Sequence, residues 1–469
     1  MSELCRLFRP DSVALVGVPR GFKAGKVFLL GLLDQGFPGR IYPVHPDAAE
    51  IDGLPCYRSL SQVPGTVDMV IVMSPRDTVA GVLEACAEKR VKVVALYTSG
   101  YAETGCEAGR REQERMRETA QRGGFRILGP NCMGVYSPEA GLAPFPGMPR
   151  TPGSVGFLSQ SGSLSNLLVN ACAPRKIFFR HVVSYGNGCD LDLPELVRWM
   201  GGDPDVRIVC AYSEGTRRAD ALAESLKALA GRKPVVMWKT GRTGAGRRAA
   251  ASHTGSLAGR EELWAGLFRQ CGVTAVDDIE GMIDTLAAFC MLPWEGEGRV
   301  ALLSGPGGPL VSAADAAERC GVPLASFAPA TRRRLAAVLP SAGTHRDNPV
   351  DVGLGASFDL TLYLETLEAL VEDPGLDAVV VLGGGVTPEM NRDYAAGLVR
   401  LRTVSGKALL AVAFPGFVRQ EAFLEPLAEA SIPVYPTPER ALRAYAALKR
   451  FLDFRSARGV GGAVRDNRC

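Results

Sequence analysis

Short apolar runs alternate with longer amphipathic stretches along the chain, and this pattern predicts a parallel α/β architecture. The runs are rich in Val, Ile and Leu, as expected for strands that are buried on both faces of a sheet. The predicted strands are Ser12–Val18, Arg40–Val44, Val67–Met73, Val91–Tyr97 and Phe125–Leu128, then Ser154–Leu158, His181–Ser184, Val206–Tyr212 and Val235–Lys239, and a further set that begins at Val300.

Two breaks divide these strands into three groups. The segment GLAPFPGMPRTPG is rich in proline, which predicts an extended linker near residue 150, and MLPWEGEGR predicts a second boundary near residue 295. We therefore expect a Rossmann-like domain over residues 1–145 and two flavodoxin-like domains over residues 153–292 and 298–455. Residues 456–469 are expected to form a disordered tail.

The second and third groups resemble two copies of one unit. The sequence VGFLSQSGSLSNLLVNAC from Val155 is similar to VALLSGPGGPLVSAADAAERC from Val300, and each reads as a strand, a serine, a glycine-rich turn and a helix. The segments GNGCDLDL and DNPVDVG follow at similar places. Common ancestry and a chance likeness between α/β units are both open at this point.

Composition narrows the classes of function. The chain has 53 basic and 50 acidic residues, and the net charge of +3 is too near neutral for an electrostatic nucleic-acid binder. Its twelve cysteines contain no CxxC pair, which predicts no metal site and fits a reducing compartment. Neither a signal pattern nor an apolar run of roughly 18 residues occurs, so we expect a cytoplasmic protein without a membrane segment.

The first domain has features of a nucleotide site. Its first strand contains Gly17 and leads through PRGFKAGK into a helix, whose first amides are suited to hold a phosphate. NAD is disfavoured because the glycine fingerprint is absent and the second strand ends in Val44, His45 and Pro46 rather than in an acidic residue. The positive charges of Arg20, Lys23 and Lys26 suit CoA, although solvated surface charge explains them about as well.

His253 is the candidate nucleophile. It lies in AAASHTGSLAG, and we expect this run of small residues to be a loop that leaves the imidazole uncrowded and its backbone free to move. Such an imidazole can attack an activated phosphorus, provided that a carboxylate on the other ring nitrogen fixes the tautomer. Glu214 is the candidate carboxylate because it follows the strand RIVCAY, at the edge where ligands of open α/β sheets bind. By contrast, we expect His181 to be structural and His345 to hydrogen-bond within a loop.

A phosphohistidine also needs an anion site, and the segment SQSGS from Ser159 to Ser163 predicts one. It joins a strand to a helix, so the free amides of the first helical turn point toward the sheet edge. We expect Leu164, Leu167, Leu168 and Ala171 to form the buried stripe of this helix. A plain tight turn is the alternative interpretation of SQSGS.

These motifs together resemble the ADP-forming acetyl-CoA synthetases and, more distantly, the α subunit of succinyl-CoA synthetase. The likeness covers nearly the whole chain through FRPDSVALVGV, GFPGRIYPVHP, SGYAETG, ILGPNCMGV, VGFLSQSGSLS, SYGNGCDLDL, YSEGT, KPVVMWKTGRTGAGRRAAASHTGSLAG, VALLSGPGGPLVSAADA, NPVDVG and IPVYPTPERAL. The resemblance implies that His253 is phosphorylated, that Glu214 is its partner, and that Ser161, Gly162 and Ser163 receive the phosphate beside Asn131. It also implies a set of residues along CoA, namely Val44, His45, Pro46, Ser74, Pro75, Ser99, Gly100 and Glu103, in addition to Gly17, Arg20 and Lys23.

The reaction implied by this resemblance joins a small carboxylic acid to CoA while ATP is converted to ADP and phosphate, through an acyl phosphate and a phosphohistidine. No ATP-grasp module is visible in the sequence, so a β-type partner subunit is expected to supply Mg-ATP or ADP in a hetero-oligomer. The chain departs from common relatives at Pro19 and at His45–Asp47, where a lysine that would meet CoA is missing.

Three other interpretations are open from the sequence. A CoA-binding acyl or carbamoyl transferase would use the same domains without a phosphohistidine. A non-catalytic CoA sensor would retain the fold, but His253, Glu214 and SQSGS all keep chemically capable residues. A nicotinamide-dependent dehydrogenase is opposed by the missing acidic residue.

Overall fold

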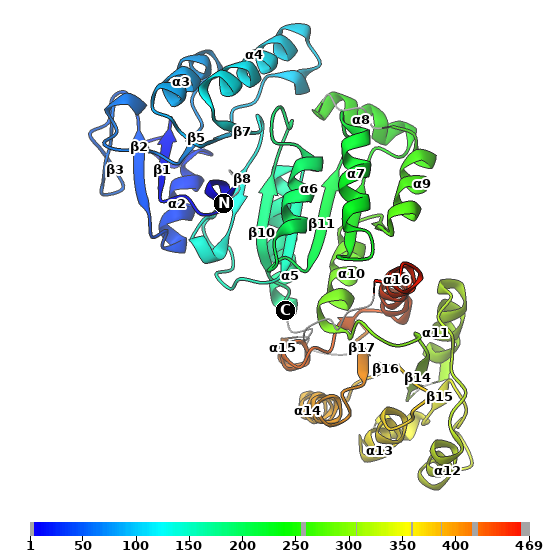
Figure 1. The fold of residues 1–469 in the computed structure, drawn as a ribbon. Helices are drawn as coiled ribbons and strands as arrows, with labels where there is room; N and C mark the ends of the chain where they lie inside the picture. Colours follow the sequence, from blue (N-terminus) through cyan, green and yellow to red (C-terminus); the bar gives the residue numbers. More distant parts are fainter. Residues whose placement is uncertain are drawn as a thin grey trace. The chain divides into compact units, whose positions relative to one another are not determined.

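The structure is a computed structural model, and it describes residues 4–254, 259–305, 307–357, 360–385, 387–414 and 421–460. Within these ranges, the side chains of residues 251–254, 356–357 and 421–422 are not described. The chain forms two compact units (Figure 1). The first runs to Asn170 and includes Phe178–Asp277, and the second combines Ala171–Ile177 with the chain from Asp278 onward.

The first unit begins with a parallel sheet of five strands in the order β2-β1-β5-β6-β7. These strands are β1 (Ser12–Val16), β2 (Arg40–Val44), β5 (Met69–Val72), β6 (Val93–Leu96) and β7 (Arg126–Leu128). All residues of β1 are buried because both faces of the sheet are covered. Val13 and Leu15 pack on one face, whereas Ala14 and Val16 pack on the other, as the two-residue period of a strand requires.

Helices cover the two faces of this sheet. Helix α2 (Lys26–Gln35) covers one face, and α3 (Arg76–Glu88) and α4 (Glu107–Gly123) pair on the other. The shorter elements are α1 (Cys5–Phe8), the hairpin β3 (Glu50–Ile51) and β4 (Leu54–Pro55), and the 3-10 turns η1 (Leu60–Gln62), η2 (Ala102–Thr104) and η3 (Pro138–Ala140).

The second sheet of this unit has the order β13-β12-β11-β9-β10-β8. Its strands are β8 (Gly134–Tyr136), β9 (Val155–Ser159), β10 (Phe179–Ser184), β11 (Ile208–Ser213), β12 (Val235–Lys239) and β13 (Thr274–Val276). Its helices are α5 (Gly162–Cys172), which continues into the 3-10 turn η4 (Ala173–Arg175), α6 (Leu193–Gly202), α7 (Ala219–Leu229), α8 (Gly244–Thr254) and α9 (Glu261–Cys271). Strand β8 pairs antiparallel with β10, so a strand that precedes the proline-rich segment belongs to the sheet that follows it.

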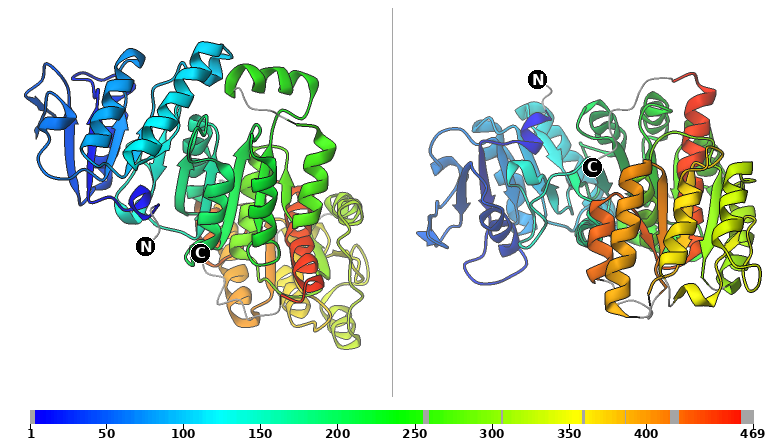
Figure 2. Two further views of the ribbon diagram at one scale, coloured as in Figure 1. Left: turned by 45° about the horizontal axis from the view of Figure 1, so that its top comes forward. Right: turned by 90° about the horizontal axis from the view of Figure 1, so that it is seen from below.

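The second unit contains the third sheet, in the order β15-β14-β16-β17-β18. Its strands are β14 (Val300–Ser304), β15 (Val350–Asp351), β16 (Ala378–Leu382), β17 (Ala408–Val412) and β18 (Val434–Tyr435). Helices lie on both faces of this sheet (Figure 2). They are α10 (Ile279–Met291), α11 (Gly307–Cys320), α12 (Pro329–Val338), α13 (Leu360–Val371), α14 (Pro388–Ser405), α15 (Glu421–Glu429) and α16 (Pro438–Ala457), with the turn η5 (Leu354–Ser357).

The proposed internal repeat is supported by topology. Matching β9 to β14 and β10 to β15 gives both sheets the same strand order, 2-1-3-4-5, which is the flavodoxin-like order. The α/β class with three strand groups is therefore confirmed, while the predicted domain limits stay predictions. Helix α16 extends to Ala457, two residues into the predicted tail, and residues 461–469 lie outside the described residues.

Two further predictions can be checked directly. His181 is structural as expected, because it is buried between a hydrogen bond to Ser137 Oγ (3.1 Å) and a contact with Asp203 Oδ2 (3.3 Å). His345 hydrogen-bonds within its loop, through Nδ1 and the carbonyl oxygen of Pro349 (2.9 Å). Within the part of the chain that the structure describes, no helix has the length and apolar character of a membrane span.

The proline-rich segment is packed rather than free. A Cβ atom on Gly31 of α2 would lie 2.3 Å from the carbonyl oxygen of Ala143, and Gln35 Nε2 donates to the carbonyl oxygen of Met148 at 2.8 Å. The segment therefore packs against α2 through close backbone contacts. A side chain larger than glycine at position 31 would break them.

We expect Gly31→Ala to destabilise the protein by about 1–3 kcal/mol, because the new methyl group has no space against a backbone carbonyl. Gly81→Ala in α3 is the matched control, since nothing lies within 4 Å of its Cβ position and alanine should stabilise that helix by up to about 1 kcal/mol. Urea unfolding followed by circular dichroism measures both changes. Equal stabilisation by the two substitutions would contradict the packing of this segment.

Candidate functional site

The carboxyl edge of the first sheet contains a switch point, where the chain leaves β1 for β2 on one side and later returns to β5 on the other. Gly17 follows β1 with φ +85°, and a Cβ atom there would lie 2.7 Å from Ser74 Cα and N. Only glycine allows this approach of two backbones. The predicted residues Gly17, Ser74 and Pro75 are therefore brought together at one edge.

The loop after β1 presents exposed Arg20 and Lys23, with Phe22 between them at 83% exposure. Lys26, the third cation of this motif, is buried and pairs with Asp52 Oδ2 at 2.7 Å. Its charge is neutralised within the protein, so the two exposed cations are the ones available to an anionic ligand.

His45 lies at the end of β2, on the same edge. Its Nδ1 accepts a hydrogen bond from the backbone N–H of Asp47 at 3.1 Å, which places the proton of a neutral ring on Nε2. His45 thus presents a ring N–H donor at this edge, beside Val44 and Pro46.

The loop after β6 contains Ser99 and Gly100. Gly100 has φ +107°, and its N–H donates to Glu103 Oε1 at 2.5 Å. Glu103 was expected to lie along the cofactor, but it is buried, and both of its carboxylate oxygens accept hydrogen bonds from protein groups. Sequence reasoning did not anticipate the inward orientation of this side chain, and the assignment of the loop to CoA stays a prediction.

The carboxyl edge of the second sheet carries the SQSGS segment. The segment joins a strand to a helix as predicted, with β9 ending at Ser159, one residue beyond the predicted end, and α5 beginning at Gly162. Ser161 Oγ lies 3.2 Å from Ser163 Oγ, and no described residue accepts from the amides of Gly162 and Ser163. The first turn of α5 therefore offers free donors to an anion.

The predicted buried stripe of α5 is wrong by one residue. Leu167 is 55% exposed, and the buried residues are Ser165, Leu168, Val169 and Cys172. Their spacing is also i, i+3, i+4 and i+7, so leucine and alanine content alone did not identify the inward face. Ser165 can be buried because its hydroxyl donates to the carbonyl oxygen of Gly162 at 2.6 Å.

Glu214 is buried directly after β11. Its backbone N–H donates to Gln160 Oε1 at 2.8 Å, which joins the carboxylate's turn to the SQSGS segment. Tyr212 OH donates to Glu214 Oε1 at 3.1 Å, and burial raises the pKa of Tyr212 to about 12, so this donor keeps its proton. Gln160 is a positioning residue that sequence reasoning missed, although it lies within the recognised motif.

A buried lysine hydrogen-bonds to the backbone of the same turn. Lys239, the last residue of β12, donates through Nζ to the carbonyl oxygens of Glu214 (2.9 Å) and Thr240. Its ammonium also lies 5.2 Å from the centre of the Trp264 ring, within cation–π range. Burial lowers the pKa of Lys239 to about 8.

His253 lies in the last turn of α8, and its side chain is outside the described set. The expected loop is therefore helical as far as Thr254, because alanine is the strongest helix former and AAA precedes the histidine. Helix α8 contacts η2, the turn that carries Glu103. Residues 255–258, which complete the predicted small-residue run, lie outside the described residues.

The edges of the two sheets meet through the segments GPN and GNG. The N–H of Asn187 donates to the carbonyl oxygen of Pro130 (3.0 Å), and that of Cys189 donates to Gly129 (2.9 Å). A Cβ atom on Gly186 would lie 2.3 Å from the carbonyl oxygens of Pro130 and Asn131, so the backbones are in direct contact.

Asn131, with φ +58°, lies in this junction. A Cβ atom on Gly162 would lie 2.2 Å from Met133 Cγ, so the segment after Asn131 touches the first residue of α5. The structure therefore brings the predicted phosphate residues next to the junction of the two sheets.

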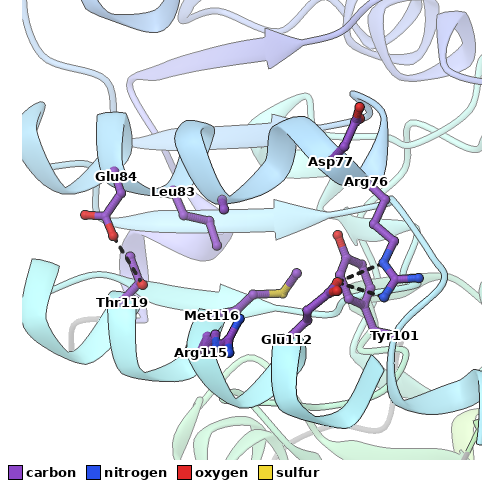
Figure 3. Close-up of a pocket in the computed structure, with 10 residues that line it drawn as sticks. Arg76, Asp77, Leu83, Glu84, Tyr101, Glu112, Arg115, Met116 and Thr119 are labelled. Carbon is purple, nitrogen blue, oxygen red and sulfur yellow. Dashed lines mark hydrogen bonds and ion pairs between the residues drawn. The ribbon is translucent and has the colours of Figure 1, made fainter. Parts of the chain in front are cut away.

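A separate cavity of about 670 Å³ lies between α3 and α4 (Figure 3). Arg76 pairs with Glu112 at 2.8 Å and lies 5.3 Å from the centre of the Tyr101 ring. The predicted site residues do not line this cavity, and its Arg76 is already paired with Glu112.

Comparisons with known proteins agree with this arrangement. The sequence profile of the CoA binding domain family matches residues 11–138, and that of the succinyl-CoA ligase like flavodoxin domain matches residues 152–289. The α subunit of acetate–CoA ligase [ADP-forming] II from Pyrococcus furiosus is 34% identical over 97% of this chain and 98% of its own length.

Two further relatives extend the comparison. Acetate–CoA ligase [ADP-forming] I from Archaeoglobus fulgidus is 34% identical over 95% of this chain, which spans 63% of that protein. A solved structure of dinucleotide forming acetyl-coenzyme A synthetase 1 from Ca. Korarchaeum cryptofilum, in complex with phosphate and ADP, matches 99% of this chain and 100% of its own. That match has a TM-score of 0.86 at 32% identity.

The lowered pKa of Lys239 predicts a pH dependence of stability. The folded chain releases this proton near pH 8, whereas the unfolded chain keeps it to about pH 10.4. Between these values the unfolded state binds more protons, so the free energy of unfolding should rise with pH.

Lys239→Met carries no proton in either state, so the difference in stability between wild type and this variant should grow in favour of wild type from pH 8 to pH 10. Urea midpoints measured across this range test the expectation. A constant difference would show that Lys239 titrates normally.

Proposed function

The chain belongs to the family of α subunits of ADP-forming acyl-CoA synthetases, and we propose that it carries the phosphoryl group on His253. Members of this family are acid–thiol ligases, and this chain is an α-subunit-like component of such an enzyme. The observation that carries the proposal is the direct bond between Gln160 of SQSGS and the N–H of Glu214. It makes the anion site and the carboxylate parts of one rigid edge.

The proposed reaction has three reversible steps. An oxygen of phosphate attacks the thioester carbonyl of an acyl-CoA, and CoA leaves as a thiolate that takes up a proton. A ring nitrogen of His253 then attacks the phosphorus of the acyl phosphate, and the carboxylate leaves. The phosphoryl group finally passes from His253 to ADP.

Different groups of this chain would bind the phosphate and orient the histidine. The free amides at Gly162 and Ser163 suit the phosphate, because they sit at the positive end of α5. Glu214, held by Tyr212, would accept the N–H of the other ring nitrogen and stabilise the imidazolium-like phosphohistidine.

CoA would lie along the first sheet. The predicted contacts are the loops with Gly17, Arg20 and Lys23, the end of β2, the Ser74–Pro75 turn and the Ser99–Gly100 turn. Arg20 and Lys23 have the charge to meet phosphates, and His45 would donate through Nε2, while Asp47 stands where the resemblance implies a lysine. Ionic attraction at this edge is therefore expected to be weaker than a lysine would give.

The nucleotide would bind on a second polypeptide. The relatives are named as α subunits, and this chain spans 63% of the Archaeoglobus fulgidus single-chain ligase. We propose that an ATP-grasp β-type subunit supplies the missing part and that the two form a hetero-oligomer in the cytoplasm. The acid is proposed to be a small carboxylate.

We expect His253→Asn to abolish phosphorylation of the chain by [³²P]acetyl phosphate while the dissociation constant for CoA changes by less than about twofold. Mass spectrometry at alkaline pH, which preserves phosphohistidine, identifies the modified residue. His345→Asn is the matched control, because that histidine bonds within a loop of the second unit. Labelling of the His253→Asn variant at the wild-type level would refute His253 as the acceptor, and a wild-type chain without any label would favour a transferase.

A further inference from the structure

Glu103 is a buried carboxylate that serves the protein rather than a ligand. Its Oε1 accepts from the N–H of Gly100 (2.5 Å), and its Oε2 accepts from the N–H of Tyr101 (3.1 Å). The third donor is Asn187 Nδ2, which lies 2.6 Å from Oε2. A buried carboxylate requires such donors, and here they come from both sides of the junction between the two sheets.

The orientation of the Asn187 amide is fixed by its neighbours. Nδ2 donates to Glu103 Oε2 and also to Gln113 Oε1 at 2.9 Å, and both of these atoms are acceptors. A flipped amide would turn its oxygen toward a carboxylate, which is unfavourable. Gln113 in turn accepts from the N–H of Ala102 at 3.4 Å.

Asn187 Oδ1 is buried and has no hydrogen-bond partner among the residues whose side chains the structure describes. Leaving such an acceptor unpaired costs about 1–3 kcal/mol, so stability alone does not explain this asparagine. Its position gives a better reason, because its backbone N–H bonds to Pro130 of GPN while its side chain bonds to the turn after β6.

We propose that Asn187 is a positioning residue that locks the CoA-side turn, Ser99–Gly100, against the phosphate-side segment that contains Asn131. The lock is the hydrogen-bonded pair of Asn187 and Glu103. Glu103 therefore serves this pair and does not contact CoA. This inference rests on the proposed function, since it assigns the two turns to two substrates that must meet. The thioester carbonyl and the phosphate then keep a fixed separation during the first step.

Loss of this hydrogen bond should affect acyl transfer and phosphorylation of His253 differently. Acyl transfer between phosphate and CoA needs both turns, and a misplacement of about 1 Å costs roughly 10²-fold in rate. Phosphorylation of His253 by an acyl phosphate needs the second sheet's edge and not the CoA turn. A variant that breaks the lock should therefore slow the first reaction and spare the second.

The experiment uses the full chain with acetyl phosphate as the probe. For Asn187→Ala, we expect formation of acetyl-CoA from acetyl phosphate and CoA to fall about 10–100-fold. Labelling of His253 by [³²P]acetyl phosphate without CoA should stay within about twofold of wild type, and the dissociation constant for CoA within about threefold. Asn170→Ala is the matched control, because Asn170 is exposed on α5 and bonds only to Asn166.

A carboxylate at the same position gives a second test. In Asn187→Asp, the new carboxylate faces two acceptor atoms, Glu103 Oε2 and Gln113 Oε1, so this variant should lose acyl transfer at least as strongly as Asn187→Ala. Thermal unfolding of each variant shows whether the fold is retained.

The outcomes separate this inference from the proposed function. Equal losses of acyl transfer and His253 labelling in Asn187→Ala, or no loss in either, would overturn the lock, as would wild-type acyl transfer in Asn187→Asp. A wild-type chain that is neither labelled nor active with acetyl phosphate would instead contradict the proposed function.

Discussion

The contact between the edge of β7 and the segment after β10 is the constraint on which both ligand edges depend. Arg126 of β7 binds Asp190 (3.0 Å) and Glu195 (2.8 Å) through its planar guanidinium, and the N–H of Leu191 donates to the carbonyl oxygen of Ile127 at 3.0 Å. Because these groups are partly buried and paired in a fork geometry, they fix direction as well as distance. Two separate sheets thereby share one functional face.

The repeat shows how the same unit acquires different chemistry. In the first copy, Ser184 pairs in register with Ser159, whereas in the second copy Asp351 pairs with Ser304. A Cβ atom on Gly307, the first residue of α11, would lie 2.6 Å from Asp351 Oδ2. The carboxylate therefore occupies the helix end that is open in the first copy, and it would repel a phosphate.

Much of this architecture could be predicted from the sequence, because buried strands carry a strong local pattern of apolar residues. Val235–Lys239 and Arg40–Val44 were predicted to the residue, because apolar runs buried on both faces give a strong signal. Strand β8 was missed, because three residues on a sheet edge carry little pattern and pair only with a distant strand. The helix at His253 was missed because small residues were taken as a loop, although alanine favours helix.

The candidate site likewise contains features that the sequence predicted and features that it did not. Glu214 and SQSGS were found through their place after strands, and the structure joins them through Gln160. The hydrogen bond from Asn187 to Glu103 and that from Lys239 to the turn of Glu214 join residues more than twenty positions apart in the chain, and no local spacing encodes such contacts. Motif recognition located these turns, and tertiary contacts decided which of their side chains are free for ligands.

The central claim is that phosphate attacks the acyl group and that its phosphorus then moves to a histidine. In this order, the bond between phosphorus and the bridging oxygen breaks, so that oxygen remains with the carboxylate. The direct measurement is mass spectrometry of the acetate formed from acetyl-CoA and [¹⁸O₄]phosphate on the chain. The account predicts acetate that contains one ¹⁸O atom derived from phosphate, and acetate without label would contradict it.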